Sequence, residues 1–157
     1  MKIYLFLFAF LILTNKTFGQ NFNLSELIMI NNYSIDRFDT YMTEKGYKYF
    51  IIENDKRRKS IGYVFYINGK ESYYMTKFYD YTDSPKLRLS FQTMSSSVYL
   101  KIKSDLKTLG FKFRDTETNE STNFLNYIKN NIEISLASSI NSGNKLTTYE
   151  ITVTKYE

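Results

Sequence analysis

The chain has 157 residues and a formal net charge of +5; 43% of its residues are hydrophobic and 24% are charged. These values are typical of one globular domain and argue against intrinsic disorder. Cysteine and histidine are both absent, which excludes disulfides, thiol nucleophiles, Ser-His-Asp catalysis and histidine-ligated zinc or haem.

Residues 1–19 have the pattern of a cleavable secretory signal peptide. Lys2 supplies a positive charge, residues 3–13 are an uninterrupted apolar run, and small residues precede the predicted cleavage between Gly19 and Gln20. The run is too short to cross a bilayer as a helix. We therefore expect export to the periplasm or the medium, with residues 20–157 as a single domain and no transmembrane helix after cleavage.

Two short helices are predicted at the start of this domain. Asn23 and Glu26 have the spacing of a helix cap, and the helix they begin extends to about residue 30. Ser34 caps a second helix whose apolar positions share one face. Gly46 follows that helix, where a left-handed residue is favoured.

A run of strands follows. The predicted strands are residues 47–53, 61–67, 71–81 and 87–93. Asn68 and Gly69 form a strong hairpin signal between the second and third strands, because both residues tolerate positive φ. The high content of Tyr and Phe, 15 and 13 residues, also favours sheet.

The same order then begins again. A residue of the serine run 95–97 can cap a helix over residues 98–109, which Gly110 ends. The strands predicted after it are residues 111–116, 124–129, 132–138 and 147–156. In this half the apolar residues share one parity and the polar residues the other, which indicates a sheet with one dry face and one wet face.

A shift of 64 residues aligns the two halves and superposes Gly46 on Gly110. The predicted fold is therefore α+β: two tandem repeats, about 23–93 and 95–157, each with helices followed by a four-stranded antiparallel sheet and with the helices packed on one face. The alternative is two unrelated helix–strand units that share ordinary capping residues.

This order of elements resembles the β-lactamase inhibitory protein family, which has two repeats of helices followed by a four-stranded sheet. The resemblance extends from Asn23 to Tyr156 and lies in element order, without a shared sequence motif. The repeats of that family usually carry a disulfide, which this chain cannot form. The resemblance implies a concave sheet that could bind a protein. In residue usage the chain is also similar to small exported proteins of Gram-negative bacteria.

The strands of the first half carry apolar residues on both parities. If the parity of the second half holds there, Phe50 and Ile52 lie on the open face of the sheet, together with some of the neighbouring aromatic residues. Exposed aromatic side chains suit binding surfaces. The predicted surface comprises Phe50, Ile52, Tyr63, Phe65, Tyr73 and Tyr74. The alternative is that a second core, the first helix or another chain covers these residues.

Charged clusters give weaker signals. The basic run Lys56, Arg57, Arg58 and Lys59 could contact an acidic partner, but it also fits a solvated loop. Asp115, Glu117 and Glu120 could supply paired carboxylates to a hydrolase, although the sequence does not set their separation. Asp36, Asp39, Asp80 and Asp83 match no calcium-binding loop. We expect no metal, no cofactor and no nucleic-acid partner.

These patterns favour a non-enzymatic module that binds a protein or an envelope component through the open face of its sheet. Two alternatives stay open: a small carboxylate-dependent hydrolase, and a structural envelope protein that self-associates through its edge strands.

Overall fold

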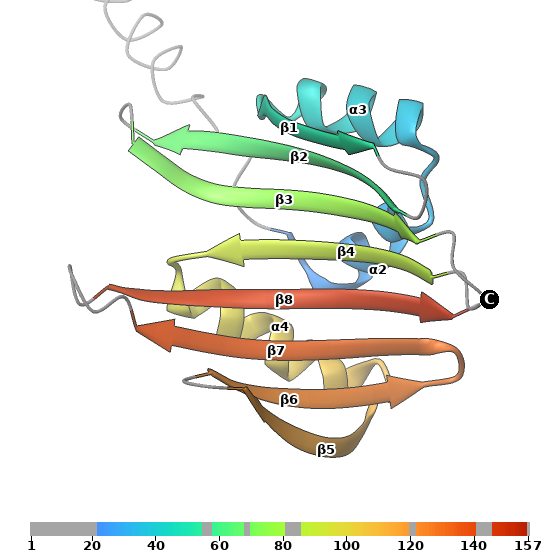
Figure 1. Ribbon diagram of the computed structural model, residues 1–157. Helices are drawn as coiled ribbons and strands as arrows, with labels where there is room; N and C mark the ends of the chain where they lie inside the picture. The colour runs from blue at the N-terminus through green and yellow to red at the C-terminus, as the bar shows by residue number, and fades with distance from the viewer. Residues whose placement is uncertain are drawn as a thin grey trace, which may run out of the picture.

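The computed structural model describes residues 22–54, 58–67, 70–80, 86–119, 122–140 and 146–156 (Figure 1). The predicted signal peptide and its cleavage site, Gly19 and Gln20, lie outside these ranges. The described residues form an α+β fold in which three helices lie on one face of an open antiparallel sheet.

The helices are α2 (Leu24–Asn31), α3 (Ile35–Glu44) and α4 (Ser96–Thr108). Each begins at a predicted cap: the side chains of Asn23, Ser34 and Ser95 accept hydrogen bonds from backbone N–H groups three residues later. Such bonds satisfy donors that the first turn leaves unpaired.

The predicted glycine signals are also confirmed at the helix ends. Gly46 and Gly110 follow α3 and α4 with φ of +80° and +77°, a conformation that residues with a Cβ rarely adopt.

The strands are β1 (Lys48–Asn54), β2 (Arg58–Ile67), β3 (Lys70–Asp80), β4 (Lys86–Thr93), β5 (Lys112–Asn119), β6 (Thr122–Lys129), β7 (Ile132–Ile140) and β8 (Thr147–Tyr156). They form one eight-stranded sheet in the order β1-β2-β3-β4-β8-β7-β6-β5, not two separate sheets of four. The prediction of two sheets is wrong because β4 pairs with β8, with Leu89 opposite Val153. This pairing satisfies backbone groups that two separate sheets would leave at exposed edges.

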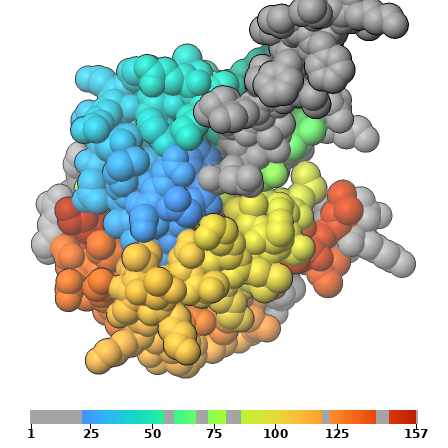
Figure 2. Space-filling model, turned by 180° about the vertical axis from the view of Figure 1, so that it is seen from behind, coloured from blue at the N-terminus to red at the C-terminus, as the bar shows by residue number. Residues whose placement is uncertain are grey.

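The core lies between the sheet and the helices. Figure 2, seen from behind, shows the helices covering this side of the molecule. Leu89, Phe91, Ile151 and Val153 from the two central strands are buried there. The helices contribute these buried apolar residues to the core: Leu24, Leu27, Ile30, Phe38, Met42, Val98, Ile102 and Leu106.

The two halves share a local irregularity. In β1 a bulge shifts the register between Tyr49 and Ile51, and in β5 a bulge lies 64 residues later, between Phe113 and Asp115. The flanking pairs also correspond, because Tyr49 pairs with Tyr63 and Phe113 pairs with Tyr127.

The constant shift of 64 does not extend past the next hairpin. Val64 pairs with Tyr74, whereas the corresponding Ile128 pairs with Glu133, so the second hairpin is shorter. Following the pairing onward, Leu89 corresponds to Ile151 and Phe91 to Val153. A constant shift of 64 would align Phe91 with the polar Lys155. The observed register aligns it with Val153 instead, and both Phe91 and Val153 are buried.

The bulge in β1 changes which side chains reach the open face. Phe50 points to that face, since its ring packs 5.9 Å from the ring of Tyr74 in a T-shaped contact. Ile51 is on the same face, opposite Gly62, and Ile52 then falls opposite Ile61, which is buried on the helix side. The predicted placement of Ile52 on the open face is therefore corrected, because simple alternation fails at a bulge.

Candidate functional site

The open face carries a row of short side chains that crosses the sheet. Cross-strand pairing places each member opposite the next, on neighbouring strands. In order from β2 to β6, the row is Gly62, Thr76, Ser90, Thr152, Ser135 and Asn126. Because each of these residues is small or polar, the row forms the floor of a shallow groove at right angles to the strands.

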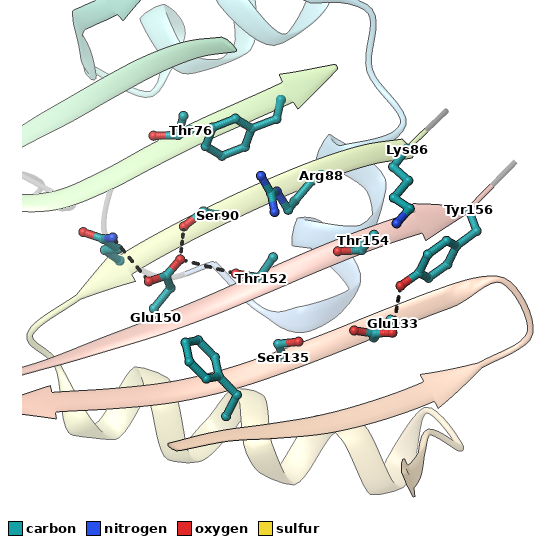
Figure 3. A pocket seen from close by; sticks show the side chains of 13 residues that line it. Thr76, Lys86, Arg88, Ser90, Glu133, Ser135, Glu150, Thr152, Thr154 and Tyr156 are labelled. Carbon is teal, nitrogen blue, oxygen red and sulfur yellow. Dashed lines mark hydrogen bonds between the residues drawn. The ribbon is translucent and has the colours of Figure 1, made fainter. Parts of the chain in front are cut away.

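Larger side chains flank the floor on both sides. One wall contains Phe78, Arg88 and Glu133, and the other contains Gln92, Glu150 and Phe124. Between the walls lies a hollow of about 540 Å³ over the central strands, lined by the middle of the floor and by both walls (Figure 3). We call this feature, floor and walls together, the open-face groove.

The wall of the open-face groove that contains Arg88 carries two cations, both on β4. The Arg88 guanidinium lies 4.7 Å from the centre of the Phe78 ring, and the Lys86 ammonium lies 5.1 Å from the centre of the Tyr156 ring. Neither cation takes part in any of the ion pairs between described residues. Stacking on a ring orients a cation while leaving its N–H donors available to a ligand.

Glu150 supplies the opposite charge on the other wall. Its carboxylate accepts hydrogen bonds from Ser90 Oγ at 2.8 Å, from Thr152 Oγ1 at 3.4 Å and from Gln92 Nε2 at 3.5 Å (Figure 3). All three donors are neutral, so these bonds fix the position of the carboxylate without cancelling its charge. The groove thus presents Arg88 and Lys86 on one wall, where the Glu133 carboxylate is paired with Arg114, and the Glu150 carboxylate on the other wall.

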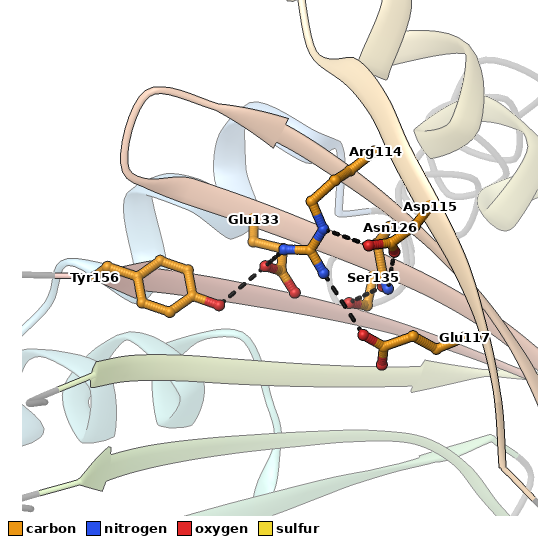
Figure 4. A network of polar contacts seen from close by, with 7 residues as sticks. All are labelled: Arg114, Asp115, Glu117, Asn126, Glu133, Ser135 and Tyr156. Carbon is orange, nitrogen blue, oxygen red and sulfur yellow. Dashed lines mark hydrogen bonds and ion pairs between the residues drawn. The ribbon is translucent and has the colours of Figure 1, made fainter.

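A polar network lies beside the groove on β5, β6, β7 and β8 (Figure 4). The guanidinium of Arg114 pairs with Asp115 at 2.8 Å, with Glu117 at 3.6 Å and with Glu133. Tyr156 also donates to Glu133, at 2.9 Å. The bulge in β5 is what brings Arg114 and Asp115 to the same face.

The same network affects the protonation of Asp115, a member of the predicted carboxylate cluster. Hydrogen bonds from Arg114 and from Asn126 hold the pKa of Asp115 below its usual value. Asp115 therefore stays ionised at neutral pH and is unsuited to act as a general acid. Glu117 is 68% exposed, and Glu120 lies outside the described residues.

The predicted aromatic surface divides between the two faces of the sheet. Phe50 and Tyr74 lie on the open face, as expected. Tyr63 and Tyr73 are instead buried on the helix side, where Tyr63 packs on Phe38 and Tyr73 stacks on Phe91.

Phe65 shares the helix side with Tyr47, with ring centres 5.1 Å apart. Tyr63, Phe65 and Tyr73 are therefore corrected from open-face residues to residues packed under the helices. The physical reason is register: Tyr63 pairs with Met75, and Met75 pairs with the core residue Phe91.

The predicted basic loop is described only in part. Lys56 and Arg57 lie outside the described residues, as does the side chain of Arg58. Lys59 is half-buried in β2, opposite Tyr79. No described residue of this run lines the hollow of the open-face groove, whose lining comes from β3, β4, β6, β7 and β8.

A lysine that the sequence did not single out is buried on the helix side. Lys77 of β3 is fully enclosed, and its ammonium donates to the backbone oxygens of Ile30, at 3.3 Å, and of Asn31 at the end of α2. Burial lowers the pKa of Lys77 to about 7. It faces away from the groove, because Lys77 lies opposite the core residue Leu89.

The floor of the groove could not be found from alternation alone. Thr76, Ser90, Thr152 and Ser135 each look like ordinary outward-facing strand residues, and only the register aligns them into one row. Among the described residues, no group of three acidic side chains is placed to hold a metal ion. Within the same ranges, no helix has the length and apolar character needed to cross a membrane.

No protein-family model matches the chain, and comparisons with curated proteins and with solved structures likewise give no significant match. The resemblance to the β-lactamase inhibitory protein family therefore stays a prediction from element order.

Proposed function

We propose that this chain is a non-enzymatic binding module that holds an extended segment of a partner protein in the open-face groove. The observation that supports this most strongly is the row of small or short polar residues that crosses the sheet from Gly62 on β2 to Asn126 on β6. A row of this kind leaves room for a chain to lie across the strands, and its Ser90 and Thr152 hydroxyls hold the Glu150 carboxylate at the edge of that space.

The charges of the groove favour a polypeptide over a uniform polyanion. A nucleic acid or an anionic lipid surface would be attracted by Arg88 and Lys86 but repelled by Glu150 on the other wall. A protein segment can present an acidic side chain to the first wall and a basic or amide group to the second. The rings of Phe78 and Phe124 add apolar contact area at the two walls.

Catalysis by the carboxylate cluster receives less support. Asp115 is held ionised beside Arg114, and Glu117 lies largely in solvent. Lys77, whose pKa lies near neutrality, is enclosed on the opposite face and has no route to a ligand in the groove. The groove therefore combines positioned charges and hydroxyls without a described acid–base pair, which suits binding.

We also infer that the two units are tandem repeats. The bulges of β1 and β5, the glycines after α3 and α4, and the first strand pairs correspond at one spacing. Their fourth strands meet at the centre of the sheet. The predicted signal peptide supports a binding partner in the cell envelope or outside the cell.

A peptide-display selection tests the proposal. Wild-type protein is used to select binders from a random peptide library, and the same library is offered to Thr152→Trp, which places a large ring on the groove floor. The matched control is Thr43→Trp, on an exposed position of α3. We expect the wild type and Thr43→Trp to enrich the same peptides and Thr152→Trp to lose them.

A second variant addresses the charge of the ligand. Arg88→Glu reverses the cationic wall, so we expect the selected peptides to change from acidic to basic at one position. The proposal is contradicted if Thr152→Trp, shown by circular dichroism to be folded, enriches the wild-type peptides with unchanged affinity, or if no peptide distinguishes the two proteins.

A further inference from the structure

The two edges of the sheet occupy corresponding places in the two halves but differ in chemistry. β1 and β5 are the outermost strands, and each has its bulge at the same point. At the bulge and the next two positions, β5 carries Arg114, Asp115 and Thr116. At the corresponding positions, β1 carries Phe50, Ile51 and Ile52.

These side chains of β1 are exposed on both faces of the sheet. Phe50 is 55% exposed and Ile51 is 37% exposed on the open side, while Tyr49 and Ile52 are each 53% exposed on the helix side. Although α3 packs near this edge, it leaves Tyr49 and Ile52 largely uncovered.

An edge strand of this kind is a template for pairing with another strand. Proteins usually prevent such pairing with charged residues on the edge. β5 has that protection in Arg114 and its carboxylate partners, whereas the centre of β1 is apolar throughout. At these positions β1 thus lacks the charged protection that β5 has, while the bulge is common to both edges.

We propose that β1 pairs antiparallel with β1 of a second copy of this chain, which continues the sheet across a two-fold axis. The chain already contains a join of this type, because β4 and β8 are corresponding strands of the two halves and pair antiparallel at the centre. The inference does not depend on the proposed function of the open-face groove.

The sequence of β1 is compatible with pairing to itself. Lys48 lies at one end, Glu53 lies toward the other, and the residues between them are apolar. Antiparallel pairing of two copies brings the basic end of each strand beside the acidic end of the other and packs the apolar centres together.

The assembly would also close at two copies. Each chain offers one apolar edge, and in the dimer both outer edges of the extended sheet would be β5. The charges of β5 oppose further addition. A chain with two apolar edges could instead add copies at both edges and form a fibre.

Sedimentation velocity over a wide range of protein concentration tests the inference. The matched variants are Ile52→Lys on β1 and Thr116→Lys at the corresponding position of β5. We expect the wild type and Thr116→Lys to form a dimer with the same dissociation constant, and Ile52→Lys to weaken that dimer by at least about tenfold.

A triple variant separates loss of the dimer from misfolding of a single variant. Phe50→Arg, Ile51→Asp and Ile52→Thr together give β1 the residues that β5 already carries in the same conformation. We expect this variant to be folded and monomeric. A wild type that stays monomeric at every concentration would overturn the inference, and so would a dimer that survives unchanged in both β1 variants. Neither result would bear on peptide binding in the groove.

Discussion

Replacement of the buried Lys77 should remove a rise in the free energy of unfolding between about pH 7 and pH 9. Lys77 is fully enclosed, and its described hydrogen-bond acceptors are the neutral backbone oxygens of Ile30 and Asn31. Burial without a carboxylate disfavours the ammonium and lowers the pKa of Lys77 from 10.5 to about 7. In the unfolded chain the side chain regains its ordinary pKa.

The sign and size of the effect follow from this difference. Between about pH 7 and pH 10.5 the unfolded chain holds the Lys77 proton and the folded chain releases it, so stability rises with pH. The slope approaches about 1.4 kcal/mol per pH unit, which amounts to about 2 kcal/mol between pH 7 and pH 9. Below about pH 6 both states are protonated and the dependence ends.

The measurement is urea unfolding of the wild type and of Lys77→Met between about pH 6 and pH 9. Methionine retains an unbranched apolar side chain and removes the titrating group. We expect the stability advantage of Lys77→Met over the wild type to shrink by about 2 kcal/mol from pH 7 to pH 9. An advantage that stays constant across this range would refute the reasoning.

At high pH the ionisation of buried tyrosines limits the rise in stability that Lys77 causes. Burial raises the pKa of Tyr47 above its ordinary value of 10. Its contribution to stability is therefore present below pH 10 and is lost as the pH rises further, which opposes the effect of Lys77. Because both proteins contain Tyr47, the difference between them isolates Lys77.

Two further predictions concern the helix caps and the polar network. Asn23→Ala removes the acceptor for the Glu26 N–H and should lower the free energy of unfolding by about 1 kcal/mol in urea titrations; an unchanged value would show that the cap is not needed. Arg114→Met should raise the pKa of Asp115 toward its ordinary value, because the guanidinium is the main cause of the lowered pKa. A carboxyl-carbon NMR titration measures this shift, and an identical pKa in both proteins would refute the assignment.

Local signals in the sequence predicted the elements of the fold well. Ser34 caps the helix that it was expected to cap, Ser95 is the capping residue within the predicted serine run, and Gly46 and Gly110 have the expected positive φ. These features depend on a few neighbouring residues, so they can be recognised without tertiary structure. The strands were located for the same reason, to within a few residues.

Features that depend on distant pairing could not be predicted. The bulge at Phe50 reverses the facing of Ile52, and no local residue marks it. The join of β4 to β8 depends on two edges that lie far apart in the sequence. Lys77 occupies a core position although its side chain is ionisable, because the end of α2 supplies its amino group with carbonyl acceptors.

The candidate site was predicted only in outline. The open face was predicted as a binding surface from the parity of the apolar residues, but the emphasis on aromatic residues selected Tyr63 and Tyr73, which lie in the core. The groove itself depends on small residues such as Ser90 and Thr152. Their importance lies in alignment across strands, which residue type alone does not reveal.

Chemical-shift mapping with a display-selected peptide is the most direct test of binding in the open-face groove. On addition of the peptide to isotope-labelled protein, we expect the largest amide shifts at Thr76, Ser90, Thr152 and Ser135, with the amides of α2, α3 and α4 nearly unchanged. Shifts confined to the helices or to the β1 edge would contradict the assignment of the groove as the binding site.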